Sequence, residues 1–281
     1  MTKLLSESAC IQYQERGYYH PIPVLSSAEA KDYRRRLEDY EARTGGPIGG
    51  VYRHKSHLLF TWLNDLIRHP AILDAVEDIL GPNLLCWSSS FFIKEAHDPS
   101  YVSWHQDSTY WGLSRPDVTT AWIGFTDSNL SNGCMEVIPG THGEQVEHHD
   151  TYAKNNLLSR GQEIAVKVDE ARAIPIELKA GQMSLHHVRL FHSSPQNPSN
   201  DRRIGYAIRY IPTDVYQVKG PKDFATLVRG VDRHGHYEHE QSPKQDLDAD
   251  ALAYHKRVCD FQGQILYAGA PIKPFTKNAE A

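Results

Sequence analysis

The stretch Trp104–His142, WHQDSTYWGLSRPDVTTAWIGFTDSNLSNGCMEVIPGTH, carries the strongest evidence for the fold. Its apolar segments 118–126 and 134–139 are short and rich in β-branched and aromatic residues, and residues of the turn-forming types separate them. These segments predict β-strands joined by turns. We therefore expect the middle of the chain to lie in a β structure.

Similar segments lie on both sides of this stretch. They span residues 84–96, 102–111, 173–187 and 202–212, and Gly, Pro, Asn and Asp again separate them. A series of short strands of this kind is typical of a β-sandwich or barrel. No repeat, low-complexity tract or linker interrupts the chain, so we predict one domain over residues 1–281.

The first 80 residues are expected to be helical. Residues 26–44 begin with two serines suited to helix capping and end before a Gly-Gly pair. Residues 56–69 and 70–80 place apolar side chains three to four positions apart, and a proline opens the second segment. The sequence therefore predicts a helical layer that packs on a β core. The more polar residues 213–281 contain one predicted helix, around 248–266, and are expected to cover the core or a pocket mouth.

Composition excludes several classes of function. The chain has 281 residues, of which 40% are hydrophobic and 23% charged, as in globular proteins with a sizeable core. A formal charge of −5 supplies no basic field for nucleic acid or an anionic membrane, and the apolar runs are far shorter than the ~20 residues that span a bilayer. Four scattered cysteines without a CxxC pair fit reduced thiols, and the N-terminus resembles no signal peptide. We therefore expect a cytoplasmic protein that binds neither nucleic acid nor a membrane.

His105 and Asp107 are candidate metal ligands. A lone His-x-Asp pair is weak evidence in a chain with 16 histidines. If residues 103–109 form a strand, however, both side chains point to one face, whereas Trp104 and Gln106 point away from it, with Trp104 expected in the core.

A second imidazole is available far downstream, at His192. Two histidines and one carboxylate on one face of an iron ion leave three positions open, which is the ligand set of non-haem Fe(II) oxygenases. Such an arrangement can hold a cosubstrate and O2 on the same metal.

Three motifs that occur in order, WHQD (104–107), AWIGFTDSNLSNGCMEVIPGTH (121–142) and FHSSPQNPSNDRR (191–203), resemble the phytanoyl-CoA dioxygenase family of Fe(II)- and 2-oxoglutarate-dependent oxygenases. The resemblance implies a mainly β fold with flanking α-helices and a double-stranded β-helix, or jelly-roll, core. That core would span about 83–212, between the helical layer at about 26–81 and the C-terminal extension 213–281. The implied activity is hydroxylation of an unactivated C–H bond of a small molecule, with release of succinate and CO2.

The resemblance also implies roles for individual residues. Three residues would bind Fe(II) and carry catalysis: His105, Asp107 and His192. Arg203, eleven residues after His192, would bind the distal carboxylate of 2-oxoglutarate, with Ser194 assisting and Trp122 lining the same pocket. A planar guanidinium suits this task because it binds a carboxylate through two parallel hydrogen bonds.

Strand parity adds candidates around Arg203. In a strand over 203–210, Arg203, Gly205, Ala207 and Arg209 share a face, whereas Arg202 points away. The small residues at 205 and 207 would leave room for a ligand between the two arginines. Arg209 is then a candidate contact for an anionic group of the substrate.

Another predicted strand, 84–96, places Ser88, Ser90, Phe92 and Lys94 on one face. Ser90 and Lys94 are candidates for the cosubstrate pocket, whereas Phe92 and Tyr110 are candidate substrate contacts. Arg53 or Lys55, a basic residue before the second helix, is an alternative to Lys94 in that pocket.

Other histidines have simpler interpretations. His186 and His187 are alternatives to His192 as the third ligand, but they lie too early for the family spacing and are expected to support the site or to pack. His142 is expected to hold a turn. The histidine-rich segment 234–239 is expected to be an exposed loop rather than a metal site.

Two rival functions stay open at the level of sequence. An iron halogenase on the same scaffold replaces the carboxylate ligand by a small residue so that halide can bind, and the presence of Asp107 favours hydroxylation instead. A non-catalytic jelly roll that binds a carboxylated ligand, or a protein with a structural metal, is the second rival. Metal analysis and a succinate assay distinguish these classes.

Overall fold

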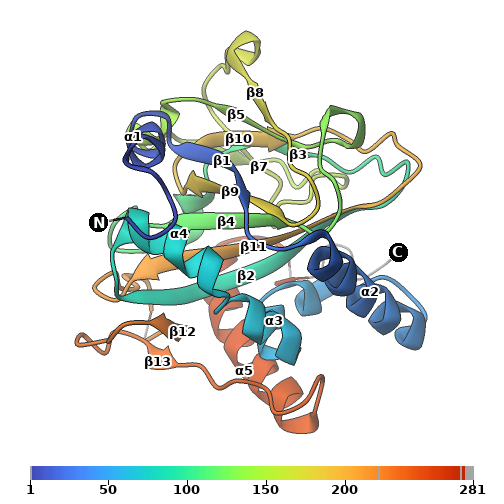
Figure 1. Cartoon of the computed structure of the whole chain (residues 1–281), viewed down its shortest axis with the longest axis vertical. Coiled ribbons are helices and arrows are strands. Elements are labelled where there is room, and N and C mark those ends of the chain that lie inside the picture. Colours follow the sequence, from blue (N-terminus) through green and yellow to red (C-terminus); the bar gives the residue numbers. More distant parts are fainter. Residues whose placement is uncertain (1, 221, 273, 276–281) are drawn as a thin grey trace.

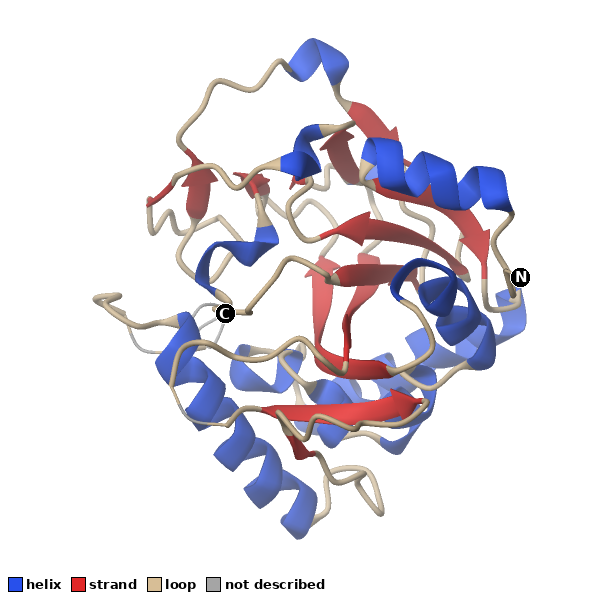
Figure 2. Cartoon of the chain, turned by 90° about the vertical axis from the view of Figure 1, so that its left-hand side faces the viewer, coloured by secondary structure: helices blue, strands red, loops and turns tan. Residues whose placement is uncertain are grey.

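The computed structural model describes residues 2–220, 222–272, 274 and 275. Two antiparallel sheets make up most of the molecule, with helices on the outer side of the larger one (Figures 1 and 2). The order in the seven-stranded sheet is β1 (Tyr18–Pro23), β9 (Gln182–His187), β4 (Thr119–Gly124), β11 (Arg203–Pro212), β2 (Leu84–Lys94), β12 (Phe224–Arg229) and β13 (Glu238–His239). The order in the four-stranded sheet is β3 (Val102–His105), β10 (Phe191–Ser194), β5 (Met135–Ile138) and β8 (Ile174–Ile176). β6 (His148–Asp150) and β7 (Gln162–Ile164) form a separate two-stranded ribbon, which contacts β3 through the bond from Ser103 Oγ to the carbonyl oxygen of Gln162 (2.7 Å). Among the described strands, β12 and β13 pair in parallel and the other pairs are antiparallel. This architecture confirms the predicted β core with flanking helices.

The helices form where the capping signals predict them. Helix α2 (Ser27–Thr44) begins with a capping box between Ser26 and Glu29 and ends at Gly45, which has a φ of +78°. Helix α4 (Pro70–Leu80) starts with its proline in the first turn, where the missing N–H has no partner to lose. Helices α1 (Glu7–Arg16), α3 (Thr61–Leu66) and α5 (Ala249–Leu266) complete the set among the described residues.

Strand β11 separates the two cores of the molecule. Its even-numbered side chains from Ile204 to Tyr210 join the apolar core beneath the helices. Its odd-numbered side chains face the small sheet, where Ala207 packs with Trp122, Met135 and Val137. The alternation predicted for residues 203–210 therefore holds, and it directs both arginines of this face into the space between the sheets.

A β-bulge in β2 changes which face its side chains occupy. Arg209 pairs with Ser88, whereas Tyr210 pairs with Cys86, so that Trp87 is the extra residue on β2. Cys86 joins the core beneath the helices, but Trp87 and Ser88 both line a cavity on the other side. The bulge thus brings an indole and a hydroxyl next to Arg209.

The N-terminal region differs from the expectation of helix throughout. Residues 18–23 form the edge strand β1, where Pro21 and Pro23 are tolerated because an edge strand needs fewer backbone donors. Residues 56–69 form a 3₁₀ turn (Ser56–Leu58) and the short α3 instead of one helix. The reason is that His57 is drawn into the core, where its ring bonds Ser89 Oγ (2.6 Å) and Glu240 (3.0 Å).

The C-terminal extension does more than cover the core. It adds β12 and β13 to the large sheet, and it is fixed from within because Glu240 forms a fully buried ion pair with Lys55. The end of α5 is fixed by Arg160, whose guanidinium donates to the backbone carbonyls of Leu266 (3.0 and 2.8 Å) and Ala268 (2.8 Å). Figure 1 shows this red helix running along the lower side of the molecule. None of the helices in the described parts of the chain is long and apolar enough to cross a membrane.

Candidate metal centre and adjoining cavities

His105, Asp107 and His192 meet between the sheets. His105 and His192 are direct partners in the antiparallel pair of β3 and β10. Asp107 Oδ1 lies 3.3 Å from Nε2 of His105 and 3.9 Å from Nε2 of His192, and the ligand atoms of all three lie within 4.8 Å of one another. Metal–ligand bonds of about 2.1 Å at right angles place neighbouring ligand atoms about 3 Å apart, so the three residues fit one metal ion. Among the described residues, this is the only group of three or more His, Cys, Asp or Glu side chains with such a spacing.

The expectation that Asp107 lies on a strand is wrong. Strand β3 ends at His105, and Asp107 begins a 3₁₀ turn (Asp107–Tyr110) whose first N–H donates to the carbonyl oxygen of Val188 at 2.9 Å. The buried Gln106 holds this turn, because its side chain donates to the carbonyls of Glu144 and Arg189 at 2.7 Å. Trp104 is also not in the core, since its ring is partly exposed and bonds Glu170. The turn, rather than strand parity, brings the carboxylate back toward His105.

The hydrogen bonds of both histidine rings suit metal binding. Nδ1 of His105 lies 2.9 Å from the carbonyl oxygen of Ser103 and 3.1 Å from that of His192. Nδ1 of His192 lies 2.9 Å from the carbonyl oxygen of Leu190. Since a carbonyl only accepts, Nδ1 carries the proton in both rings and the lone pair of Nε2 points to the shared centre.

Electrostatics keep the ligands in their metal-binding forms. Burial holds the pKa of His192 well below the ordinary value, so its imidazole is neutral near pH 7. Burial alone would raise the pKa of Asp107, but the adjoining His105 ring and the neighbouring His192 and Arg209 lower it below the ordinary value. A carboxylate next to the neutral imidazole of His192 favours a divalent cation.

The remaining histidines differ in where they lie relative to the metal centre. His186, on β9, lies next to the centre: its ring centroid is 5.1 Å from that of His192, and its buried Nδ1 has no hydrogen-bond partner. His187 points to the other side of the sheet, where it contacts His142. His142 holds its turn against α1 through the carbonyl oxygen of Gln14 (3.0 Å), as expected. Segment 234–239 is an exposed loop only in part, because Tyr237 is buried and Glu238–His239 form β13; His239 pairs with Asp232.

An inner chamber extends from the three ligands to Arg203. Arg203 is buried and donates to Ser194 Oγ (3.0 Å) and to the carbonyl oxygen of Gly133, whereas its Nε has no hydrogen-bond partner. Trp122 forms a wall, with its ring centroid 5.5 Å from the guanidinium carbon. Thr120, two residues before Trp122 on the same face of β4, also lines the chamber, and its hydroxyl has no hydrogen-bond partner. Sequence analysis missed Thr120, although its parity with Trp122 was the available signal.

Lys94 lies behind Ser194 at the Arg203 end of the chamber and is not among the residues that line it. Lys94 Nζ bonds Ser194 Oγ (2.6 Å), the same hydroxyl that Arg203 contacts. Burial, followed by the charge of Arg203, lowers the pKa of Lys94 to about 6. Arg202 points outward and pairs with Glu41 and Glu95, as its parity predicts. The space expected at Gly205 is absent, because the Trp122 ring fills the place where a side chain would begin.

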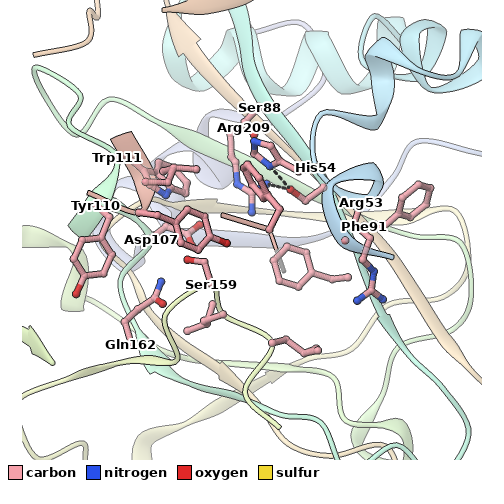
Figure 3. A pocket seen from close by; sticks show the side chains of 18 of the residues that line it. Arg53, His54, Ser88, Phe91, Asp107, Tyr110, Trp111, Ser159, Gln162 and Arg209 are labelled. Carbon is pink, nitrogen blue, oxygen red and sulfur yellow. Dashed lines mark hydrogen bonds between the residues drawn. The ribbon is translucent and has the colours of Figure 1, made fainter. Parts of the chain in front are cut away.

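An outer cavity adjoins the inner chamber and opens to the surface (Figure 3). The two share Phe92, Asp107 and Arg209, so these residues line the passage between them. The outer cavity is lined by Ser88, Ser90 and Tyr110, among others. The hydroxyl of Ser90 accepts a hydrogen bond from Arg209 (3.1 Å), and Ser90 does not line the inner chamber. Ser90 therefore belongs to the outer cavity rather than to the predicted cosubstrate pocket.

The two basic alternatives to Lys94 also lie elsewhere. Arg53 lines the outer cavity. Lys55 is sealed in the core by its ion pair with Glu240 and its hydrogen bond to the carbonyl oxygen of Phe224 (3.0 Å). The C-terminal segment was expected to cover the core or a pocket mouth, and its Leu266, Tyr267 and Phe275, which the sequence did not single out, line the same cavity. No local sequence signal connects those residues to a site more than 50 positions upstream.

Comparisons with known proteins agree with this geometry. The family model of phytanoyl-CoA dioxygenase (PhyH) matches residues 13–205. A probable alpha-ketoglutarate-dependent hypophosphite dioxygenase from Stutzerimonas stutzeri is 29% identical over 232 residues, which cover 74% of this chain and 79% of that protein. The L-proline trans-4-hydroxylase of Streptomyces griseoviridis is 29% identical over 230 residues, covering 72% and 85%.

Two solved structures show the same fold along most of the chain. The apo form of the non-heme monooxygenase ThoJ superposes with a TM-score of 0.82 at 33% identity and covers 92% of this chain and 97% of its own. CytC3 with Fe(II) and alpha-ketoglutarate superposes with a TM-score of 0.66 at 25% identity, covering 88% and 98%.

A two-sheet β core that brings two histidines and one carboxylate together defines a non-haem iron oxygenase. The chain belongs to the phytanoyl-CoA dioxygenase family. It is an Fe(II)- and 2-oxoglutarate-dependent dioxygenase, with Fe(II) as cofactor and 2-oxoglutarate as cosubstrate, and the family recognised from the sequence is confirmed.

Proposed function

We propose that the protein hydroxylates an unactivated C–H bond of a small molecule held in the outer cavity. The overall reaction converts the C–H bond, O2 and 2-oxoglutarate into C–OH, succinate and CO2. The observation that carries the proposal is the connection of two spaces at Asp107: a basic inner chamber for the cosubstrate and a largely apolar outer cavity for the substrate. The names of two relatives, a hydroxylase and a dioxygenase of small molecules, support the same type of reaction.

In this proposal each side chain of the inner site has one task. His105, Asp107 and His192 bind Fe(II), which when bound supplies the activation of O2 that no side chain can perform. Arg203 and Ser194 bind the distal carboxylate of 2-oxoglutarate, with Lys94 adding charge beneath them. Trp122 closes the chamber on the side of Gly205 and so restricts the cosubstrate to one orientation.

The outer residues position the substrate and exclude water. Phe92 stands at the passage between the cavities, while Leu266 and Tyr267 cover the outer cavity from the C-terminal segment. Excluding water protects reactive species from side reactions and fixes the C–H bond that faces the metal. A cytoplasmic location and the absence of nucleic-acid or membrane partners stay predictions from the sequence.

The experiment that tests the proposal measures succinate and product mass. The purified Fe(II) protein, supplied with 2-oxoglutarate and O2, is expected to form succinate slowly on its own. Formation should accelerate when a fractionated metabolite extract contains the substrate, and the product should be heavier by one oxygen atom even in saturating chloride. We expect oxygen rather than chlorine in the product because the carboxylate of Asp107 is placed to bind the metal, at the position that a halide would need.

Two results would contradict the proposal. A chlorinated product would identify a halogenase, and the absence of succinate from the iron-loaded protein would identify a binding protein. Asp107→Ala is the matched control, because removing this anionic ligand is expected to abolish succinate formation.

Lys94 is expected to make 2-oxoglutarate binding depend on pH. In the free protein the pKa of Lys94 is lowered to about 6, so the amine is mostly neutral near pH 7. The incoming carboxylate favours the ammonium form, and binding therefore takes up a proton. Affinity should fall as the pH rises above about 6, by at most about tenfold per pH unit.

Calorimetric titration of the iron-loaded, oxygen-free protein checks this prediction. Proton uptake is measured from the difference between two buffers with different ionisation enthalpies. Lys94→Met, which fills a similar volume without a charge, should lose most of the pH dependence. An unchanged dependence in that variant would place the proton on another group.

A further inference from the structure

Two arginines face the outer cavity without a carboxylate partner in the described parts of the chain. Arg53 comes from a 3₁₀ turn (Gly50–Arg53), and its guanidinium donates only to the carbonyl oxygen of Ile93, at 3.4 Å. Arg209 comes from β11 and donates only to Ser90 Oγ, at 3.1 Å. Figure 3 shows Arg209 close to Trp111 and Asp107, with Arg53 across the cavity.

The charge of Arg209 is uncompensated once a metal is bound. Its side chain is 7% exposed, and an unpaired charge at such a depth is costly for the folded protein. Asp107 is the one acidic residue among the described residues that line the cavity, and metal binding uses its charge. The cavity therefore keeps an excess of positive charge in the holoenzyme.

Several buried polar atoms around Arg209 also lack a hydrogen-bond partner. They are Nε of Arg209, Nε of Arg53 and Oγ of Ser88, and all three residues line the cavity. The β-bulge at Trp87 places the Ser88 hydroxyl opposite Arg209 across the strand pair. Buried donors are almost always satisfied in native proteins, so this set indicates a ligand that supplies acceptors.

The walls of the cavity are flat and aromatic. The rings of Trp87 and Trp111 lie 4.9 Å apart, and the guanidinium of Arg209 lies 5.5 Å from the Trp111 ring and 5.7 Å from that of Phe92. On the other side, the ring of Phe275 stacks on His54 at 4.8 Å. Burial lowers the pKa of His54 to about 3, so that this ring adds an uncharged surface. Such walls suit a flat apolar body.

We propose that the substrate is an organic oxyanion, a carboxylate or phosphonate with a flat apolar body, and that Arg209 and Ser88 bind its anionic group. This inference rests on the proposed function, because it assigns the outer cavity to the substrate. Arg209 lines both cavities, so the anionic group lies beside the metal and the oxidised carbon is near that group. Arg53 attracts the anion from the far side of the cavity.

Binding without turnover tests the proposal. The probes are 3-phenylpropionate, phenylphosphonate, the neutral 3-phenylpropanamide and the cationic phenethylamine, each titrated by calorimetry into the Fe(II)·2-oxoglutarate enzyme without oxygen. At least one anion is expected to bind about ten- to a hundredfold more tightly than the amide, as charge-assisted hydrogen bonds are the stronger ones. Whichever anion binds more tightly distinguishes a carboxylate from a phosphonate substrate.

Variants locate the anionic group. Arg209→Gln keeps a donor toward Ser90 and should remove that preference, whereas Arg209→Lys should keep part of it because the charge stays. Arg53→Gln should weaken the anion less. Arg172→Gln, at an exposed site outside the cavity, is the matched control and should bind like the native protein. Thermal unfolding should show Arg209→Gln at least as stable as the native enzyme without ligand, since it removes an unpaired buried charge.

Several outcomes would overturn the proposal. Equal binding of anion and amide, or binding of none of the probes, excludes an oxyanion subsite. A loss of 2-oxoglutarate affinity in Arg209→Gln as large as the loss for the anion would assign Arg209 to the cosubstrate. A lower unfolding temperature would assign it a structural role. Succinate formation by the native enzyme is measured separately, so that failure of the catalytic proposal is seen independently of the binding results.

Discussion

Replacing His192 by alanine is expected to abolish stoichiometric Fe(II) binding. The ring of His192 is fixed by the 2.9 Å bond from Nδ1 to the carbonyl oxygen of Leu190, and its Nε2 faces Asp107 Oδ1 at 3.9 Å. Without His192, one imidazole and one carboxylate remain, and two ligands are too few to hold the iron of an oxygenase in a defined geometry. Iron content after desalting, with succinate formation as a second readout, measures the effect.

The neighbouring histidines supply graded controls. His187→Ala should bind iron as the native protein does, because His187 faces the opposite side of the sheet. His186→Ala should weaken iron binding about ten- to a hundredfold, as is typical when a residue that supports a ligand is lost. If His192→Ala retains iron while His186→Ala loses it, the third ligand is His186.

Replacing Arg203 by alanine is expected to cause a large loss of affinity for 2-oxoglutarate. Its guanidinium is 2% exposed at the end of the inner chamber, so its loss leaves the distal carboxylate of 2-oxoglutarate buried without a cation. Breaking such a pair costs about 3–5 kcal/mol, which corresponds to a rise of about two to four orders of magnitude in the 2-oxoglutarate concentration for half saturation. Iron binding should stay near the native level, because Arg203 contacts none of the three ligands in the described structure.

Two companion variants make the Arg203 result specific. Arg203→Lys should recover only part of the affinity, since an ammonium cannot form the two parallel bonds of a guanidinium. Arg202→Ala should leave the 2-oxoglutarate titration unchanged, because Arg202 pairs with Glu41 and Glu95 outside the chamber. A normal titration in Arg203→Ala would refute the assignment of the chamber.

The parts of the site that lie on regular strands could be predicted from the sequence. The side chains of a strand point alternately to its two faces. Once Arg203 was assigned to the inner face, Ala207 and Arg209 followed on that face and Arg202 on the other. The same rule gave the shared face of Ser88, Ser90 and Phe92. It worked because β2 and β11 pair over their whole length in the centre of the sheet.

Other features depend on contacts between distant segments. Asp107 reaches His105 through a turn that Val188 and Gln106 hold, and no local pattern encodes that turn. The bulge at Trp87 appears only when β2 is aligned with β11. The sequence offered Lys55 as a possible cation of the cosubstrate pocket, but in the fold it pairs with Glu240, which lies 185 positions further along the chain.

The fixed end of α5 has a consequence for how this enzyme can diversify. Arg160 holds backbone carbonyls of residues 266 and 268, so the closure of the cavity does not depend on which side chains stand there. Those side chains lie beyond residue 205, where the match to the family model ends, whereas the three metal-centre residues and Arg203 lie within it. Evolution, or an engineer, can therefore exchange this wall of the cavity and change the molecule that is oxidised while the machinery that oxidises it is inherited intact.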